Sequence, residues 1–123
     1  MRTGQTTAEE AIRISRREDM RQRGFPQYTV RPPGDRPTYA AVTHIEPLDA
    51  ENQRVLGLDA YMVPAAREAL DRAADTGALA VSALLPLAQD EPAGGARGLV
   101  MYLPIYASGA ALDTLQQRRA ALL

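Results

Sequence analysis

His44 is the only histidine of the chain, and this limits the catalytic chemistry that the sequence supports. A metal site would have to combine His44 with carboxylates such as Glu46 or Asp59, and no ligand spacing supports such a site. A nucleophilic serine would need the same histidine as its base. None of the serines lies in the strand-turn-helix context of a nucleophile elbow: Ser15, Ser82 and Ser108. We therefore interpret His44 as a structural residue.

Thiol chemistry and phosphate binding are disfavoured as well. The chain has no cysteine, which excludes disulfides, thiolate metal sites and a thiol nucleophile. The glycine-rich stretch EPAGGARG at 91–98 does not follow the strand-to-helix pattern of a phosphate-binding loop, and it indicates a hairpin. We therefore expect no enzyme activity, no metal and no cofactor.

The strongest candidate site is a pocket between a helix at 64–75 and two strands at 79–89 and 99–106. Alternation along each strand gives one wholly aliphatic face, which we expect to pack, and one face of small or hydroxyl-bearing residues. Ser82 and Tyr102 lie on the second face, so the sequence predicts that this face lines the pocket. The alternative is that both hydroxyl groups only satisfy backbone groups within a core.

Arg67 on the predicted helix is the cation of this candidate pocket. Its guanidinium fork could hold a ligand carboxylate, but Asp71 lies one turn later and offers a structural ion pair instead. Both interpretations remain open at this point. The apolar walls of the pocket would come from four residues, each of which could also belong simply to the core: Tyr61, Met62, Leu84 and Val100.

Local signals predict the elements that position this pocket. Pro64 suits the first position of the 64–75 helix because it loses no hydrogen bond there, and Gly77 follows the end of that helix. Pro86 indicates an edge or bulged position in the 79–89 strand. The remaining predicted elements are a polar helix at 7–23, strands at 28–31 and 38–46, a short helix from Asp49 to Leu56, and an amphipathic helix at 108–123 capped by Ser108.

Composition sets the class of the protein. A chain of 123 residues supports a single domain, and its net charge of −1 gives no electrostatic reason to expect a nucleic-acid partner. No run approaches the roughly 18 apolar residues of a membrane span. Residues 1–15 lack the apolar core of a signal peptide, so we expect the chain to be soluble as it stands.

Several spaced motifs together resemble a known family. They are VRPPGDRPTYAAVTHIEPLDAENQRVLGLD at 30–59, PAAREALDRAADTG at 64–77, a serine-containing strand, the pair Gln89 and Asp90, and LVMYLPIY at 99–106. In this order, from about Ile12 to Leu123, they are similar to the CHASE domain. That domain is the extracytoplasmic sensory module of membrane histidine kinases, nucleotide cyclases and diguanylate cyclases.

The resemblance implies an α+β fold in which residues 28–106 form a PAS-like antiparallel sheet flanked by helices, with a small-molecule ligand between sheet and helices. It also implies a periplasmic location in a longer receptor, with transmembrane helices that are absent from this chain and that carry the signal to an output domain. We expect a homodimer. The alternative is a homodimerisation module without a functional pocket, joined through the terminal helices.

One departure from the family bears on the ligand. Family members that bind adenine-type plant hormones place a carboxylate just before the arginine of the pocket helix. Ala66 stands at that position here. The resemblance therefore disfavours a cytokinin and leaves the ligand open.

Overall fold

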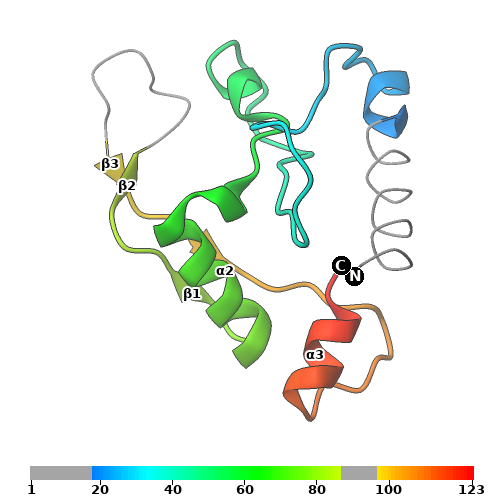
Figure 1. The fold of residues 1–123 in the computed structure, drawn as a ribbon, viewed down its shortest axis with the longest axis vertical. Coiled ribbons are helices and arrows are strands. Elements are labelled where there is room, and N and C mark those ends of the chain that lie inside the picture. Colours follow the sequence, from blue (N-terminus) through cyan, green and yellow to red (C-terminus); the bar gives the residue numbers. More distant parts are fainter. Residues whose placement is uncertain (1–17, 87–96) are drawn as a thin grey trace. The chain divides into compact units, whose positions relative to one another are not determined.

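The computed structural model describes residues 18–86 and 97–123, which belong to two compact units, Met1–Ala60 and Tyr61–Leu123. The described residues form α-helices, short 3-10 helices and small antiparallel sheets (Figure 1). This mixture confirms the predicted α+β class.

The first unit begins with a helical turn at 18–22, the described end of the helix predicted at 7–23; residues 7–17 lie outside the described part. Met20 on this turn is buried, and so is Tyr28, whose hydroxyl donates a hydrogen bond to the Val42 carbonyl over 3.2 Å. The helix ends before Gly24, which has a φ of 103°, a value that glycine adopts readily. The predicted end of the helix is therefore confirmed.

The strands predicted at 28–31 and 38–46 are wrong as regular strands. Each segment makes a single isolated bridge, Arg31 with Leu58 in parallel and Ala41 with Asp59 in antiparallel orientation. The 57–59 stretch that they share lies between two 3-10 helices, η1 (Asn52–Val55) and η2 (Ala60–Met62). This extended stretch is too short to form a regular β-ladder with either the 28–31 or the 38–46 segment.

The short helix predicted from Asp49 to Leu56 is present as η1. The Asp49 Oδ1 atom accepts a hydrogen bond from the Asn52 amide over 2.8 Å, which satisfies one of the donors that a helix start leaves free. Gly57 ends the turn with a φ of 83°. The helix is shorter than predicted and its N-cap is Glu51, but Asp49 does bind its first turn and the helix ends before Gly57 as predicted.

The main helix of the second unit is α2 (Pro64–Thr76), which confirms the helix predicted at 64–75. Pro64 occupies its first turn, and Gly77 closes it with a φ of 72° and a hydrogen bond from its amide to the Ala73 carbonyl. Its buried residues are all alanines: Ala66, Ala69 and Ala73. Small side chains on this face let the helix lie close to β1 (Ala80–Val81) and β4 (Met101–Tyr102), against which it packs (Figure 1).

The two long strands predicted at 79–89 and 99–106 are each interrupted. β1 pairs with β4 in antiparallel orientation, and β2 (Leu85–Pro86) pairs with β3 (Arg97–Gly98). Ala80 stands opposite Tyr102 in the first sheet, whereas Leu85 stands opposite Gly98 in the second, so the register shifts by one residue between them. A β-bulge between β1 and β2 accounts for this shift. Residues 87–89 lie outside the described part of the chain.

The bulge moves side chains from one face to the other. Ala80 and Ser82 are buried, as expected for one face of a strand, but Leu84 is 63% exposed and Leu85 is buried instead. Alternation holds only while the pairing is regular, because a one-residue slip reverses the face of every side chain beyond it. The prediction that Leu84 shares a face with Ser82 is therefore wrong.

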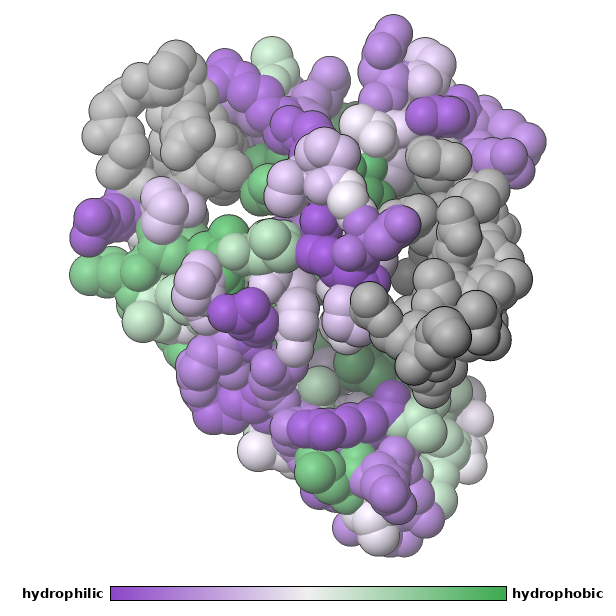
Figure 2. Space-filling view, in the orientation of Figure 1, coloured by the Kyte–Doolittle hydropathy of each residue, from purple (hydrophilic) through white to green (hydrophobic). Residues whose placement is uncertain are grey.

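The aliphatic face of the strand segments was predicted to pack, and this prediction is wrong for most of its described residues. Six of them are between 41% and 69% exposed: Leu79, Val81, Leu99, Met101, Leu103 and Ile105. Figure 2 shows hydrophobic residues gathered on the surface over the segments beside β2 and β3. The face of small residues packs against α2 instead, because alanines on both sides allow close approach.

The C-terminal helix is shorter than predicted. It is α3 (Leu115–Ala121), and its cap is Thr114 and not Ser108. Thr114 and Gln117 form a capping box, in which the Thr114 Oγ1 atom accepts from the Gln117 amide and the Gln117 side chain accepts from the Thr114 amide. Beyond α3 the chain pairs with residues 105–107 through two backbone hydrogen bonds.

Candidate functional site

Two of the predicted site residues, Tyr61 and Arg67, lie together near the start of α2. The Tyr61 hydroxyl donates a 2.7 Å hydrogen bond to the Asp71 carboxylate, and the Arg67 guanidinium lies 5.9 Å from the centre of the Tyr61 ring. In the part of the chain that the structure describes, Arg67 forms no ion pair with Asp71. Asp71 is instead bound by Tyr61, which leaves the exposed face of the Arg67 guanidinium available for a planar anion.

The Asp71 carboxylate also changes the acidity of Tyr61. Its hydrogen bond raises the pKa of the Tyr61 phenol above the ordinary value, because an ionised phenol could no longer donate to it. Desolvation of the phenol acts in the same direction. Tyr61 therefore remains a neutral hydrogen-bond donor at neutral pH.

Ser82 and Val100 lie opposite one another across the gap between the two sheets. The Ser82 amide donates to the Val100 carbonyl over 2.8 Å, and the Val100 amide donates to the Ser82 Oγ atom over 2.9 Å. The side-chain oxygen replaces a backbone acceptor at the bulge, where the regular ladder is broken. Val100 is half-buried, so this hydrogen bond keeps its amide from remaining unsatisfied away from water.

Tyr102 lies on the face of β4 that meets α2. It packs against a cluster of three buried alanines, Ala69, Ala73 and Ala80. Burial raises the pKa of the Tyr102 phenol, since the ionised form would lose its hydration. A small-residue helix and a partly buried tyrosine thus form one closely packed layer. A ligand can enter this layer only if α2 moves away from the strands.

The predicted apolar walls are placed differently. Met62 and Leu84 are 44% and 63% exposed, whereas Val100 is half-buried beside Ser82. The structure therefore brings together Tyr61 with Arg67, Ser82 with Val100, and Tyr102 with α2.

The end of α2 is tied to the C-terminal segment by polar contacts. The Arg119 guanidinium binds both oxygens of the Asp75 carboxylate at 2.8 and 2.9 Å, and this bond lowers the pKa of that carboxyl group. The Arg118 side chain donates to the Asp75 carbonyl, and the Tyr106 hydroxyl donates to the Ala74 carbonyl, each over 2.6 Å. A displacement of α2 would therefore be passed directly to α3.

The residues considered for metal binding do not converge. His44 is exposed, and Asp59 is fully buried and bound to Arg36 in the first unit. Within the described ranges no group of three or more histidine or acidic side chains is arranged to hold a metal ion. The same ranges contain no helix with the length and apolar character of a membrane span.

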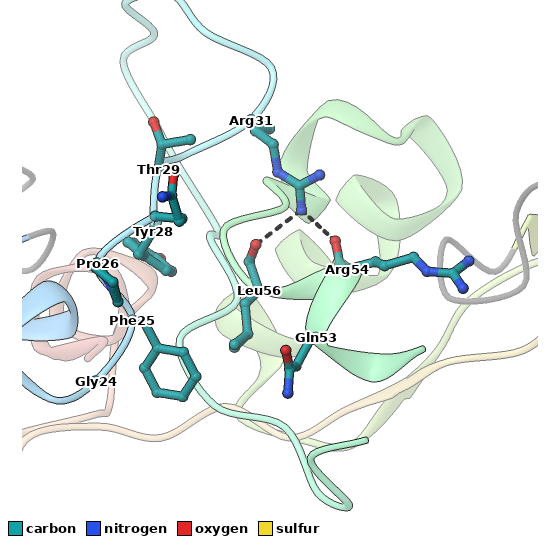
Figure 3. A pocket seen from close by; sticks show the side chains of 10 residues that line it. Gly24, Phe25, Pro26, Tyr28, Thr29, Arg31, Gln53, Arg54 and Leu56 are labelled. Atoms are coloured by element: carbon teal, nitrogen blue, oxygen red, sulfur yellow. Dashed lines mark hydrogen bonds between the residues drawn. The ribbon is translucent and has the colours of Figure 1, made fainter. Parts of the chain in front are cut away.

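A hollow of about 430 Å³ lies in the first unit, between residues 24–31 and 53–56 (Figure 3). Sequence reasoning did not indicate it, because its walls are two loop segments that are distant in the chain. The one available signal was compositional: Phe25 and Pro26 are apolar residues that no predicted strand or helix face uses.

Comparison with known families covers almost the whole chain. The family model for the CHASE domain matches residues 4–123. No curated protein sequence matches the chain. CHASE domains are extracellular sensory domains of signalling receptors, so the match assigns a sensory class of function. The similarity inferred from the spaced motifs is confirmed: the chain belongs to the CHASE domain family.

Proposed function

We propose that this chain is the ligand-sensing part of an extracytoplasmic receptor and that it has no enzyme activity. The observation that carries the proposal is the family match over residues 4–123. In the proposed receptor the chain lies in the periplasm. Transmembrane helices outside the present sequence connect it to an output domain.

The proposed ligand is a small organic molecule, and its site is the layer between α2 and the strands. Arg67 holds a carboxylate of the ligand with the face of its guanidinium that Asp71 leaves unpaired. Ser82, Val100 and Tyr102 bind the body of the ligand on the strand side, while Tyr61 and Met62 cover its exposed edge. This arrangement is PAS-like, with the ligand between a sheet and its connecting helix.

The close packing of α2 supplies a mechanism for sensing. In the free state the alanine face of α2 rests on Tyr102, so a ligand that enters this layer has to displace the helix. Such a ligand selects a second arrangement of the same elements, and its differential affinity sets the population of that state. Asp75 then carries the movement to α3 through Arg119 and Arg118.

A second candidate function is homodimerisation without ligand binding. The observation that favours it is the exposed aliphatic face of the strand segments, which includes Leu99, Met101 and Leu103. Exposed apolar area that is contiguous marks an interaction surface more often than chance. In this alternative the face of β4 opposite α2 meets the same face of a second copy.

A thermal-shift screen against amino acids, carboxylates and purines tests the sensing proposal. A ligand at about 100 times its Kd stabilises the folded state by about 2.7 kcal/mol, which for a chain of this size raises the Tm by about 10 °C. Arg67→Gln is expected to weaken a carboxylate ligand about tenfold and so to cut this shift by about half. Arg97→Gln is the matched control, since it removes an exposed cation of the same unit, and the full shift should remain.

Two outcomes contradict the proposal. The first is that no compound of the panel raises the Tm. The second is that the Tm depends on protein concentration and on nothing else, which favours homodimerisation. If Arg67→Gln and Arg97→Gln reduced the ligand-induced Tm shift equally, Arg67 would not be a residue of the ligand site.

A further inference from the structure

The hollow in the first unit has the size of a small-molecule site. Its volume of about 430 Å³ falls within the range of about 300–1,000 Å³ that is typical of ligand pockets. Its described lining residues all belong to 24–31 and 53–56, which are parts of the first unit. Figure 3 shows Phe25 on one side of it, Leu56 and Gln53 on the other, and the Arg31 guanidinium at one end.

The walls of the hollow are held by hydrogen bonds. The Phe25 amide donates to the Met20 carbonyl and the Tyr28 amide donates to the Phe25 carbonyl, which fixes the turn that carries the aromatic ring. The Arg21 side chain donates to the Tyr28 carbonyl over 3.2 Å. A wall that is ordered before binding costs less conformational entropy when a ligand arrives.

Hydrogen bonds fix the orientation of the Arg31 guanidinium without using all of its donors. Its Nη2 atom donates to the carbonyls of Arg54 and Leu56, and the bond to Leu56 measures 2.9 Å (Figure 3). Within the described ranges, the Nε and Nη1 groups of Arg31 donate to no other group of the protein. A guanidinium that is fixed through Nη2 holds its Nε group in a defined direction, where it can donate one charge-assisted hydrogen bond to a carboxylate oxygen.

The charge of the lining has one sign. Arg31 and Arg54 are both part of it, and none of its lining residues within 18–86 and 97–123 is acidic. The Arg54 side chain points away from the hollow in Figure 3, so Arg31 is the cation that faces a ligand. A single cation at one end and an aromatic ring with aliphatic neighbours along the walls select a molecule with one anionic group and a flat apolar body.

We propose that this hollow is a second ligand site, distinct from the layer between α2 and the strands, and that it binds small aromatic carboxylates. One carboxylate oxygen accepts a hydrogen bond from Nε of Arg31, and the ring lies between Phe25 and Leu56. Thr29 and Gln53 add polar groups at the rim. The site gives the receptor a response to an aromatic acid that does not depend on Arg67.

Sodium benzoate is the probe, and benzamide, which has the same shape without the charge, is its control. Titration of the ¹⁵N-labelled chain is expected to shift the amide signals of residues 24–31 and 53–56, Pro26 excepted since it has no amide. Benzoate is expected to bind at least about tenfold more tightly than benzamide, because only the carboxylate accepts charge-assisted hydrogen bonds. This comparison uses the unaltered chain, so it does not depend on any variant folding.

Variants then identify the residues. Arg31→Gln should bring the affinity for benzoate down to that for benzamide, and Phe25→Ala should weaken both compounds. Arg23→Gln is the matched control, since Arg23 is exposed, pairs with Asp19 and lies outside the lining. The affinity of this variant for benzoate should be unchanged. Equal binding of benzoate and benzamide to the unaltered chain, or shifts confined to residues 61–86 and 97–123, would overturn the proposal. The thermal-shift result with Arg67→Gln is independent of these outcomes.

Discussion

Asp59→Ala is expected to lower the free energy of unfolding by about 3–5 kcal/mol. Asp59 is fully buried, and its Oδ2 atom accepts from Nε and Nη2 of Arg36 at 3.0 and 2.9 Å. Its Oδ1 atom accepts from the Ala40 amide over 2.8 Å. Removal of this carboxylate leaves the Arg36 charge, whose side chain is only 15% exposed, and a backbone amide without their partner.

Urea denaturation followed by circular dichroism measures this loss. Asp19→Ala is the control, because it breaks an exposed ion pair with Arg23 and should cost less than about 1 kcal/mol. The double replacement Arg36→Met with Asp59→Leu should recover much of the stability, since it buries no unpaired charge. Equal losses for Asp59→Ala and Asp19→Ala would show that the buried pair does not hold the first unit together.

Gly57→Ala is expected to lower the free energy of unfolding by at least about 3 kcal/mol. Gly57 has a φ of 83°, which side chains adopt with strain, and an added Cβ atom would overlap the Thr29 carbonyl oxygen. The backbone cannot yield easily here, because the Gly57 amide donates to Val42 and its carbonyl accepts from Arg31, each over 2.8 Å. Gly57→Ala therefore combines backbone strain at a positive φ with a steric clash against the Thr29 main chain.

Gly109→Ala separates these two effects. Gly109 has a similar φ of 75°, but nothing lies within 4 Å of an added Cβ atom. Gly109→Ala should lower the free energy of unfolding by about 1–2 kcal/mol, the cost of placing a side chain in this left-handed conformation. Both variants are compared with the unaltered chain by urea denaturation, and a Gly57→Ala cost no larger than that of Gly109→Ala would contradict the close approach to Thr29.

The features that the sequence predicted well depend on local signals. Pro64 and Gly77 mark the two ends of α2, and the small helix before Gly57 follows from Asp49. Each signal acts within a few residues, so no knowledge of the tertiary structure is needed to interpret it. The family match was likewise predictable, because its motifs are strings in the sequence.

The start of α3 could also have been predicted. Thr114 and Gln117 have the spacing of a capping box, and this signal is more specific than the serine at 108. The interruption of the strands could not have been predicted in this way, because it depends on the Ser82 hydroxyl oxygen accepting the hydrogen bond of the Val100 amide in place of a backbone carbonyl. That exchange shifts the register by one residue and reverses the faces assigned beyond it.

Pairings between distant residues were beyond the reach of sequence patterns. Arg36 and Asp59 are far apart in the chain, and nothing local indicates that the first neutralises the second. The hollow between 24–31 and 53–56 likewise arises only when two loops meet. For the candidate site, the sequence identified the chemistry of Arg67 and Ser82 but not the direction in which each strand face points.

A crystal structure of the chain with the compound that raises its Tm most is the most direct test of the sensing claim. Density for the ligand is expected in contact with Arg67 and with the strand face that carries Ser82 and Tyr102. In the same structure α2 is expected to be displaced from its contact with Tyr102. Tyr102 still packed against Ala69 and Ala73 as in the free chain, with the ligand bound elsewhere, would contradict the claim.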